Sequence, residues 1–267
     1  MAGEVIGMAI SLLTLNTWKG DGAYRRRMHH LRQALSGGPW SICCFQEVFD
    51  AEGEERSTVR HLEAALPAHR CYVTPARPKL RQLGATGALL PSTSGLMIMT
   101  TFPSAGALEV LALPDCEQDQ DRRAQILTLR TPAGLVRLVN VHFTHLRQGD
   151  ALRRAQVRTL FEALSARNRA EPVAATVIAG DFNCEADSPA LAPLHEAGGR
   201  FLPPDAPPAA GTAGRFSRSG FSRTLDHVVL LSDQWSYLRH ETLFAHCPTG
   251  PHALSDHAAV SACFGGG

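Results

Sequence analysis

The stretch Gly180-Asp181-Phe182-Asn183 could carry chemistry, because it places two polar side chains directly after an apolar run. The run from Thr176 to Ala179 is typical of a buried strand, and side chains two residues apart on a strand point to the same side. Asp181 and Asn183 could then hold a water molecule or a metal-bound phosphate oxygen together. A simple Asx turn after a strand would have the same residues, so the rest of the chain must decide.

The same arrangement recurs along the chain, where an acid, amide or imidazole lies beside the end of an apolar run. The residues in this situation are Asn16, Glu47, His142, Asp181, Asn183, Asp226, Asp256 and His257. If the strand ends converge, several carboxylates gather at one rim, and they cannot all be ionised cheaply without a cation between them. Carboxylate and amide oxygens with few Cys ligands suit Mg²⁺ or Mn²⁺ better than structural zinc.

Each of these residues also has an interpretation without chemistry. Glu47 alone could be a solvated loop acid, and His142 alone could be a buried histidine with satisfied hydrogen bonds. Asp226 could pair with Arg223, and Asp256 could cap a turn. Only the ordered set goes beyond these separate interpretations.

The elements that must position these side chains follow from hydrophobic periodicity. Apolar runs predict strands at 9–15, 41–45, 96–101, 108–113, 125–131, 135–143, 174–180, 225–231, 242–245 and 258–264. Apolar residues at helical spacing predict helices over about 24–35, 58–66 and 150–168. Strands and helices interleave with no repeat, linker or break in composition, so we expect a single domain over residues 1–267 with a mixed sheet core covered by helices.

Local signals refine this outline. Asp150 is expected to cap the third helix, and Ser188-Pro189 to open a short helix that Gly198 closes. Arg25 to Arg27 are expected on the solvated face of the first helix. Residues 77–95 and 203–214 are rich in polar residues, Gly and Pro, and are expected to form surface loops.

Composition excludes some classes of protein. The chain has 267 residues, 44% of them hydrophobic, and no run long enough to span a bilayer. The apolar segment 8–15 lacks the flanks of a secretory signal, and the formal net charge of +1 argues against a tight, non-specific binder of nucleic acid. Seven cysteines, an odd number without a C-x-x-C pair, indicate buried reduced thiols in a cytoplasmic protein.

Six short pieces occur in a fixed order along nearly the whole chain. They are Leu15-Asn16-Thr17-Trp18, Gln46-Glu47-Val48, Val139-Asn140-Val141-His142, Gly180-Asp181-Phe182-Asn183, Thr224-Leu225-Asp226-His227-Val228-Val229 and Ser255-Asp256-His257. Together they resemble the endonuclease/exonuclease/phosphatase superfamily of metal-dependent phosphoesterases. The resemblance implies an α/β (α+β) fold, a four-layer α/β/β/α sandwich of two packed mixed sheets flanked by helices. The rim of strand ends would be its active site.

The resemblance also implies a role for each side chain. Glu47 would be the principal ligand of Mg²⁺ (or Mn²⁺), with Asn16 nearby and Asp256 supporting the metal site. Asp181 would orient or deprotonate the attacking water, and Asn183 would help to fix it.

The remaining residues would act on the phosphoryl group. His257, paired with Asp226, would stabilise its charge from one side and His142 from the other. The implied reaction is in-line attack of water on phosphorus, with one or two metal ions clamping a phosphate oxygen.

The substrate is expected to be a phosphoester: a phospholipid, a nucleotide or a nucleic acid. Apurinic endonucleases of the superfamily usually have an acid two positions after the first Asn, where this chain has Trp18. The piece around Asn16 and the stretch Ser94–Pro103 are more similar to the neutral sphingomyelinase-like branch. We expect no stable insertion into a membrane and a monomeric protein.

Two alternatives stay open. In a nuclease of the same superfamily, basic residues would track phosphates along a groove. The candidates are Lys79, Arg81, Arg122, Arg123, Arg147 and Arg218, of which Lys79 and Arg81 are the predicted substrate-binding pair. In a catalytically silent member, the same domain would serve as a binding module.

Overall fold

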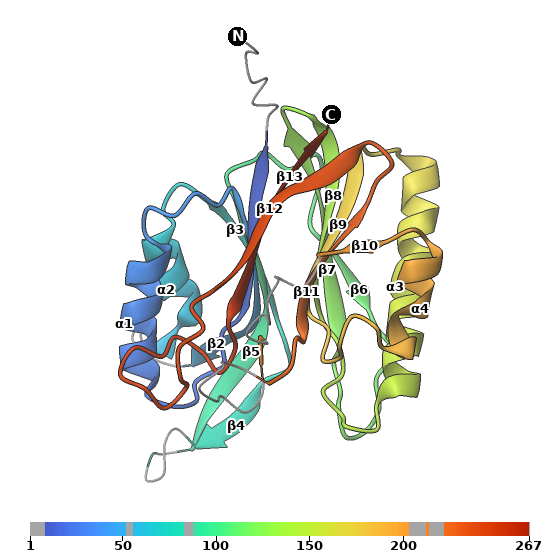
Figure 1. The fold of residues 1–267 in the computed structure, drawn as a ribbon. Coiled ribbons are helices and arrows are strands. Elements are labelled where there is room, and N and C mark those ends of the chain that lie inside the picture. The colour runs from blue at the N-terminus through green and yellow to red at the C-terminus, as the bar shows by residue number, and fades with distance from the viewer. Residues whose placement is uncertain are drawn as a thin grey trace.

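Two β-sheets pack face to face, and helices cover both outer faces (Figure 1). The computed structural model describes residues 9–51, 56–82, 87, 89–202, 212–213 and 222–266. This arrangement is the predicted four-layer α/β/β/α sandwich, so the prediction of the fold is confirmed.

The first sheet has seven strands, in the order β12-β13-β1-β2-β5-β3 with β4 paired to β5. The strands are β1 (Ile10–Asn16), β2 (Ile42–Ala51), β3 (Arg70–Pro75), β4 (Lys79–Gln82), β5 (Leu89–Thr100), β12 (Trp235–Leu243) and β13 (Ala259–Gly266). Because β1 and β2 are parallel while β1 and β13 are antiparallel, this sheet is mixed, as predicted.

The second sheet has six strands, in the order β10-β11-β9-β8-β7-β6. They are β6 (Glu109–Ala112), β7 (Arg123–Thr131), β8 (Gly134–His142), β9 (Ala175–Asp181), β10 (Arg200–Phe201) and β11 (Asp226–Leu231). The parallel pair β8 and β9 is joined by the long helix α3 (Asp150–Ala170), which is the crossover that parallel neighbours require.

Helices α1 (Tyr24–Leu35) and α2 (Thr58–Ala65) cover the first sheet, while α3 and α4 (Ala192–Glu196) cover the second. A short 3₁₀ helix, η2 (Pro189–Leu191), precedes α4. Strands near the middle are buried on both faces: Leu12 of β1 packs into the core between the sheets, and Leu13 packs toward α1. Continuous apolar runs are the sequence signature of such strands.

A chain of buried amides connects the two sheets. Gln46 lies on β2, whereas Asn140 and Gln125 lie on β8 and β7, and all three side chains are fully buried. Gln46 Nε2 donates to Asn140 Oδ1 over 2.8 Å, and Asn140 Nδ2 lies 3.0 Å from Gln125 Oε1. Asn140 Nδ2 also donates to the carbonyls of Phe45 and Met97 in the first sheet, each over 3.1 Å. These bonds fix how the sheets lie against each other.

The prediction of a loop over 77–95 is wrong for the part that the structure describes. Lys79–Gln82 forms β4, and β5 begins at Leu89, with Lys79 paired to Ser92 and Arg81 to Leu90. The two strands are short of buried apolar residues, so their periodicity did not stand out against the Gly and Pro around them. Residues 83–86 and 88 lie outside the described residues.

The sequence also missed β3 and most of β12. Both lie at the margins of the first sheet, and β12 keeps Arg239 and Glu241 exposed. Edge strands carry charges on exposed positions, which obscures the apolar signal used for prediction.

Two helix termini test the predictions of helix caps that were made from the sequence. Asp150 does not cap α3, because the N-cap is Gly149 and the Asp150 carboxylate pairs with Arg153 within the first turn. Ser188 does cap η2, since its Oγ accepts from the backbone N–H of Ala190 over 3.3 Å. Gly198, with φ of +75°, follows α4 as predicted.

All seven cysteines are free; Cys43, Cys44 and Cys184 are buried, whereas the other four are half-buried. No helix in the described part of the chain is long and apolar enough to cross a membrane. The predicted loop 203–214 lies outside the described residues except for residues 212 and 213.

Asn140→Ala should destabilise the fold by about 3 kcal/mol or more, because it leaves the Gln46 amide and two strand carbonyls buried without their donor or acceptor. Urea unfolding followed by circular dichroism measures the change. Gln148→Ala, at an exposed amide, is the control and should change stability by less than about 0.5 kcal/mol. Equal effects of the two substitutions would show that the amide chain does not hold the sheets together.

Candidate active site

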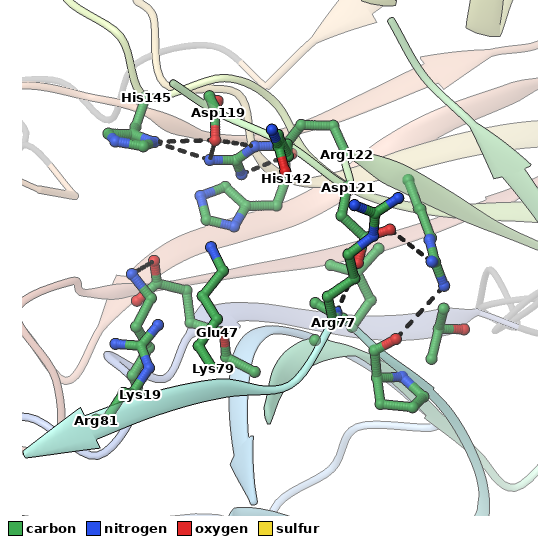
Figure 2. Close-up of a pocket in the computed structure, with 18 residues that line it drawn as sticks. Lys19, Glu47, Arg77, Lys79, Arg81, Asp119, Asp121, Arg122, His142 and His145 are labelled. Carbon is green, nitrogen blue, oxygen red and sulfur yellow. Dashed lines mark hydrogen bonds and ion pairs between the residues drawn. The ribbon is translucent and has the colours of Figure 1, made fainter. Parts of the chain in front are cut away.

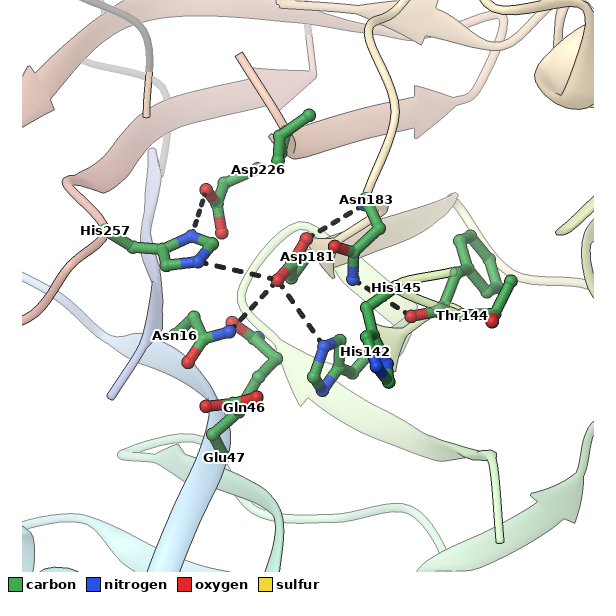
Figure 3. Close-up of polar contacts among 12 residues, drawn as sticks. Asn16, Gln46, Glu47, His142, Thr144, His145, Asp181, Asn183, Asp226 and His257 are labelled. Atoms are coloured by element: carbon green, nitrogen blue, oxygen red, sulfur yellow. Dashed lines mark hydrogen bonds and ion pairs between the residues drawn. The ribbon is translucent and has the colours of Figure 1, made fainter. Parts of the chain in front are cut away.

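The strand ends of both sheets meet at one rim (Figure 3). The first sheet brings Asn16 from the end of β1, Glu47 from β2, and Asp256 and His257 from the turn before β13. The second sheet brings His142 from the end of β8, Asp181 from the end of β9 and Asp226 from the start of β11. Hydrogen bonds and short polar contacts join most of the predicted residues into one cluster.

Gly180 determines where Asp181 lies. Its φ is +146°, and a Cβ at this position would lie 2.0 Å from the carbonyl oxygen of Val141. Only glycine therefore allows β8 and β9 to approach so closely, and this approach sets His142 directly beside Asp181 in the parallel register.

The Asp181 carboxylate is buried and held from two sides. Asn16 Nδ2 donates to its Oδ2 over 3.0 Å, across the two sheets, and the backbone N–H of Asn183 donates to its Oδ1 over 2.9 Å. The bond from Asn183 closes an Asx turn. The Asx turn and the candidate site, which the sequence offered as alternatives, are therefore formed by the same residues. Asn183 itself is anchored by a 3.0 Å bond from its Nδ2 to the carbonyl of Phe143.

Two imidazoles flank the Asp181 carboxylate. His142 Nε2 lies 3.5 Å from Asp181 Oδ2, and His257 Nε2 lies 3.8 Å from the same oxygen. On its other side, His257 Nδ1 is 2.8 Å from Asp226 Oδ2. Asp226 pairs with this histidine rather than with Arg223, whose ion pair is to Glu185 at 3.8 Å.

The electrostatics of the site separate the two histidines. Burial alone would lower the pKa of His257, but Asp226 and then Asp181 raise this pKa to about 10. Burial, with Arg122 and Lys19 nearby, holds the pKa of His142 well below its usual range. At neutral pH one face of Asp181 therefore meets an imidazolium and the other a neutral imidazole. Burial and the proximity of Asp226 raise the pKa of Asp181.

Glu47 reaches the rim through a β-bulge. Phe45 pairs with Met97 and Val48 with Gly95, so two residues of β2 oppose a single residue of β5. Glu47 adopts φ of +54° in this bulge, and such bulges re-aim side chains next to active sites. The strand continues to Ala51, which corrects the prediction that it ends before Gln46-Glu47. The Glu47 carboxylate is 2.8 Å from Lys19 Nζ.

The donor set of the rim fits a divalent cation. Among the described residues, Asp181, Asp226 and His257 offer ligand atoms that lie within 4.8 Å of one another. Asp226 Oδ1 is buried and has no hydrogen-bond partner in the described part of the chain. Burial and the nearby Glu47 carboxylate raise the pKa of Asp256 to about 6, so these two acids form a second concentration of negative charge.

Arg27 is the structural residue that the sequence interpretation missed. It was expected on the solvated face of α1, but only 1% of it is exposed. It lies on the apolar stripe, three residues after Tyr24 and four before Leu31, and that spacing was the signal for its burial. Burial lowers its pKa only to about 10, so Arg27 stays charged at neutral pH.

The Arg27 guanidinium binds main-chain oxygens from two segments of the rim. It donates to the carbonyls of Thr17, Trp18, Lys19, Asp21 and Leu254. The first four follow Asn16, and Leu254 precedes Ser255-Asp256-His257. Trp18 also stacks on the guanidinium, with 4.8 Å from Arg27 Cζ to the ring centroid. Arg27 thus ties the loop after β1 to the turn before β13.

A pocket adjoins the rim and shares Glu47 and His142 with it (Figure 2). Of the residues proposed for a phosphate-tracking groove, the structure brings Lys79, Arg81, Arg122 and Arg123 into this pocket, while Arg147 does not line it. Arg218 lies outside the described residues.

A family model for the Endonuclease/Exonuclease/phosphatase family matches residues 13–257 of this sequence. The chain belongs to this family. All six motifs lie inside the matched range, so the resemblance predicted from them is confirmed. Members of the family hydrolyse phosphoric esters, and this chain is accordingly an enzyme of the metal-dependent phosphoric ester hydrolase class.

Solved structures show the same fold at low sequence identity. An endonuclease/exonuclease/phosphatase from Bacteroides vulgatus is 16% identical, with a TM-score of 0.72 over 97% of this chain and 99% of that one. The human Nocturnin catalytic domain with bound sulfate is 14% identical, with a TM-score of 0.71 over 98% and 96%.

TDP2 from Caenorhabditis elegans is 15% identical, with a TM-score of 0.68 over 96% of this chain and 74% of that one. No curated protein matches the sequence.

Arg27→Ala should lower the free energy of unfolding by about 3 kcal/mol or more, since it leaves carbonyls of both rim segments without their donor. Arg27→Lys should recover only part of this loss, because an ammonium cannot reach the same set of oxygens. Chemical denaturation measures both. Arg26→Ala, at the exposed neighbouring position, is the control, and an equal loss there would contradict the role of Arg27.

The free energy of unfolding of EDTA-treated protein should fall as pH rises from about 6.5 to about 10. His257 has its ordinary pKa near 6.5 when unfolded and a pKa of about 10 when folded, so its stabilising charge is complete below the lower value and lost through the upper one. Denaturation at several pH values tests this. Asp226→Asn should flatten the dependence of the free energy of unfolding on pH. If the pH profiles of the variant and the unsubstituted protein stayed parallel, the role assigned to His257 would be wrong.

Proposed function

We propose that this chain is a Mg²⁺-dependent phosphodiesterase that hydrolyses a phosphoester bond by in-line attack of water. One observation carries the proposal: a buried carboxylate, Asp181, is fixed by Asn16 and Asn183 and meets two imidazoles of opposite charge state. This arrangement offers an acceptor for a water proton between two donors for phosphoryl oxygens.

Asp181 is the proposed base or orienting group for the water. Its raised pKa brings a carboxylate closer to the range in which it takes up a proton. Asn183 keeps the carboxylate orientation fixed through its backbone N–H. Because Asn16 binds the other carboxylate oxygen, the acid cannot rotate away from the rim.

The histidines are proposed to stabilise charge on the phosphoryl group. Asp226 holds the Nδ1 side of His257, which directs the Nε2–H toward Asp181 and the substrate. His142 approaches from the opposite side as a neutral imidazole.

Glu47 is proposed as the principal ligand of Mg²⁺ (or Mn²⁺). Asn16 lies near this metal site, and Asp256 supports it. A bound divalent cation would neutralise charge that develops on phosphate oxygens. The close group of Asp181, Asp226 and His257 and the unpartnered Asp226 Oδ1 support cation binding at this rim.

The proposed substrate is a phospholipid, nucleotide or nucleic acid, and Lys79 and Arg81 are the proposed substrate-binding residues. The β4–β5 hairpin has two faces: Lys79 and Arg81 line the pocket, whereas the alternate residue Leu80 and Leu89 are exposed. The exposed leucines favour a sphingomyelinase-like activity at a lipid surface. We further propose one domain over residues 1–267, acting as a monomer in the cytoplasm, where its free thiols stay reduced.

A nuclease is the alternative, favoured by the cations of the pocket. A nuclease held by phosphate contacts should lose affinity for DNA or RNA steeply as salt rises, and a flat response would remove this alternative. In the remaining alternative, a silent binding module, Mg²⁺ would leave the thermal midpoint unchanged.

Asp181→Asn should lower kcat on bis(p-nitrophenyl) phosphate by about 10³-fold with little loss of folding, because the side chain keeps its size but not its basicity. Release of p-nitrophenol is followed with Mg²⁺, Mn²⁺ or EDTA, with p-nitrophenyl phosphate as the monoester. Asp187→Asn, an exposed acid nearby, is the control and should retain activity. If the unsubstituted protein turned over neither ester with either metal, the proposed activity would be wrong.

A further inference from the structure

Four of the chain's 12 histidines gather where the segment that follows β12 meets helix α1. His29 and His30 lie on α1, whereas His246 and His252 lie in residues 244–254, between β12 and the turn before β13. Figure 1 shows this segment, in red, beside α1, in blue. None of the four lines the pocket beside the rim or belongs to the close group of rim ligands, so neither accounts for the cluster.

The rings of three of these histidines form a chain of contacts. The ring centroids of His30 and His252 lie 5.6 Å apart, and those of His252 and His246 lie 6.5 Å apart. Two imidazoles that bind one tetrahedral ion at a metal–nitrogen distance of about 2 Å have ring centroids roughly 5 Å apart. The first pair is therefore close to the spacing of two ligands of one ion, and His246 needs to approach by only about 1 Å.

The ring nitrogens of these three histidines are available to a ligand. Within the described residues, no hydrogen bond engages the imidazole of His30, His246 or His252. His246 and His252 are exposed and His30 is half-buried. Turning the rings toward a common point therefore breaks no hydrogen bond in the described part of the chain, and it disturbs little packing.

The backbone of the segment brings its two histidines together. The backbone N–H of His246 donates to the carbonyl of Phe244 over 2.7 Å, and that of Gly250 donates to the carbonyl of Cys247 over 2.8 Å. These tight turns fold the segment back on itself. Because of this folding, His246 and His252 come into ring contact although they are six residues apart in the sequence.

Arg27 holds the same segment against the same helix. Its guanidinium donates to the carbonyl of Leu254 over 2.8 Å. Arg27 precedes His30 by three residues on α1, and residues at this spacing are neighbours on a helix surface. Leu254 follows His252 by two residues. One hydrogen bond and one ring contact thus join α1 to the segment side by side, and an ion bound by the histidines would add a third link.

We propose that His30, His246 and His252 bind a transition-metal ion of the Zn²⁺ class, at a site separate from the proposed Mg²⁺ site of the rim. Imidazole nitrogen is a common ligand of Zn²⁺, whereas Mg²⁺ takes oxygen ligands. Water fills the fourth tetrahedral position. His29 is not a ligand, because consecutive side chains on a helix point about 100° apart and its ring meets that of His30 rather than the segment.

The position of the site gives the ion a role. The segment that carries His246 and His252 continues directly into Ser255–His257, the turn that brings Asp256 and His257 to the rim. An ion that ties the segment to α1 therefore stabilises this turn from outside the rim. The ion is structural in this role, and it binds whether or not the rim catalyses hydrolysis.

Calorimetry with Zn²⁺ tests the site, on protein treated with EDTA and then freed of it, in excess Mg²⁺. One equivalent of Zn²⁺ should bind without being displaced by Mg²⁺. His30→Gln, His246→Gln and His252→Gln should each weaken this binding at least about tenfold, because the ion loses one of three protein ligands. His29→Gln is the matched control, and Asp226→Asn is the control for the rim; both should leave this equivalent unchanged.

Two results would overturn the site: an affinity for Zn²⁺ that survives all three substitutions, or an equal loss in His29→Gln or Asp226→Asn. Circular dichroism checks that each variant is folded, as expected for changes at exposed or half-buried positions.

Hydrogen exchange tests the role of the ion. Zn²⁺ should slow amide exchange in residues 244–257 of the unsubstituted protein, and it should have no such effect on His252→Gln. Exchange in this range that is the same with and without bound Zn²⁺ would overturn the stabilisation of the turn.

Discussion

The candidate active-site rim depends on one constraint, the fixed position of two separate sheets relative to each other. Asn16 and Glu47 come from one sheet and Asp181 and His142 from the other, so a small sliding of the sheets would separate them. Apolar side chains between the sheets supply most of the burial, but such packing has little directional preference. The buried amides centred on Asn140 add direction, since each bond holds only in one register. The chemistry of the rim is thus supported by polar groups deep in the core.

A second constraint is carried by charge. Arg27 is a buried cation whose partners are carbonyl oxygens, and it joins two segments that lie far apart in the sequence. These segments directly adjoin the rim residues Asn16 and Asp256. Because a guanidinium has five donors in a rigid plane, a single side chain can organise both segments. A positive group that stays charged at neutral pH therefore lies between the two segments that carry Asn16 and Asp256.

Apolar runs predicted the central strands and the polar residues at their ends, while the resemblance carried by the six motifs implied the four-layer arrangement of the sheets. Buried strands are continuous apolar runs, and motifs such as Gly180–Asn183 stand at their ends. Edge strand β3 and most of edge strand β12 were missed because polar and charged residues at their exposed positions interrupt the apolar pattern. The bulge at Glu47 and the contacts of Arg27 depend on residues distant in sequence, which no local pattern encodes. The spacing of Arg27 within the apolar stripe of α1 was available and was outweighed by its charge.

Left-handed backbone conformations gather where the site is built. Trp18, Lys19, Glu47 and Asn183 all have positive φ, although none is a glycine, and each such residue costs about 1–2 kcal/mol. Their side chains make contacts at the rim: Trp18 stacks on Arg27, Lys19 pairs with Glu47, and Asn183 binds the carbonyl of Phe143. Glycine would relax the backbone and remove these contacts. A screen for thermostable variants would therefore select substitutions at these positions first, and the gain in stability would come with a loss of activity. Stabilising changes are better sought on the outer faces of the helices, where the backbone is unstrained.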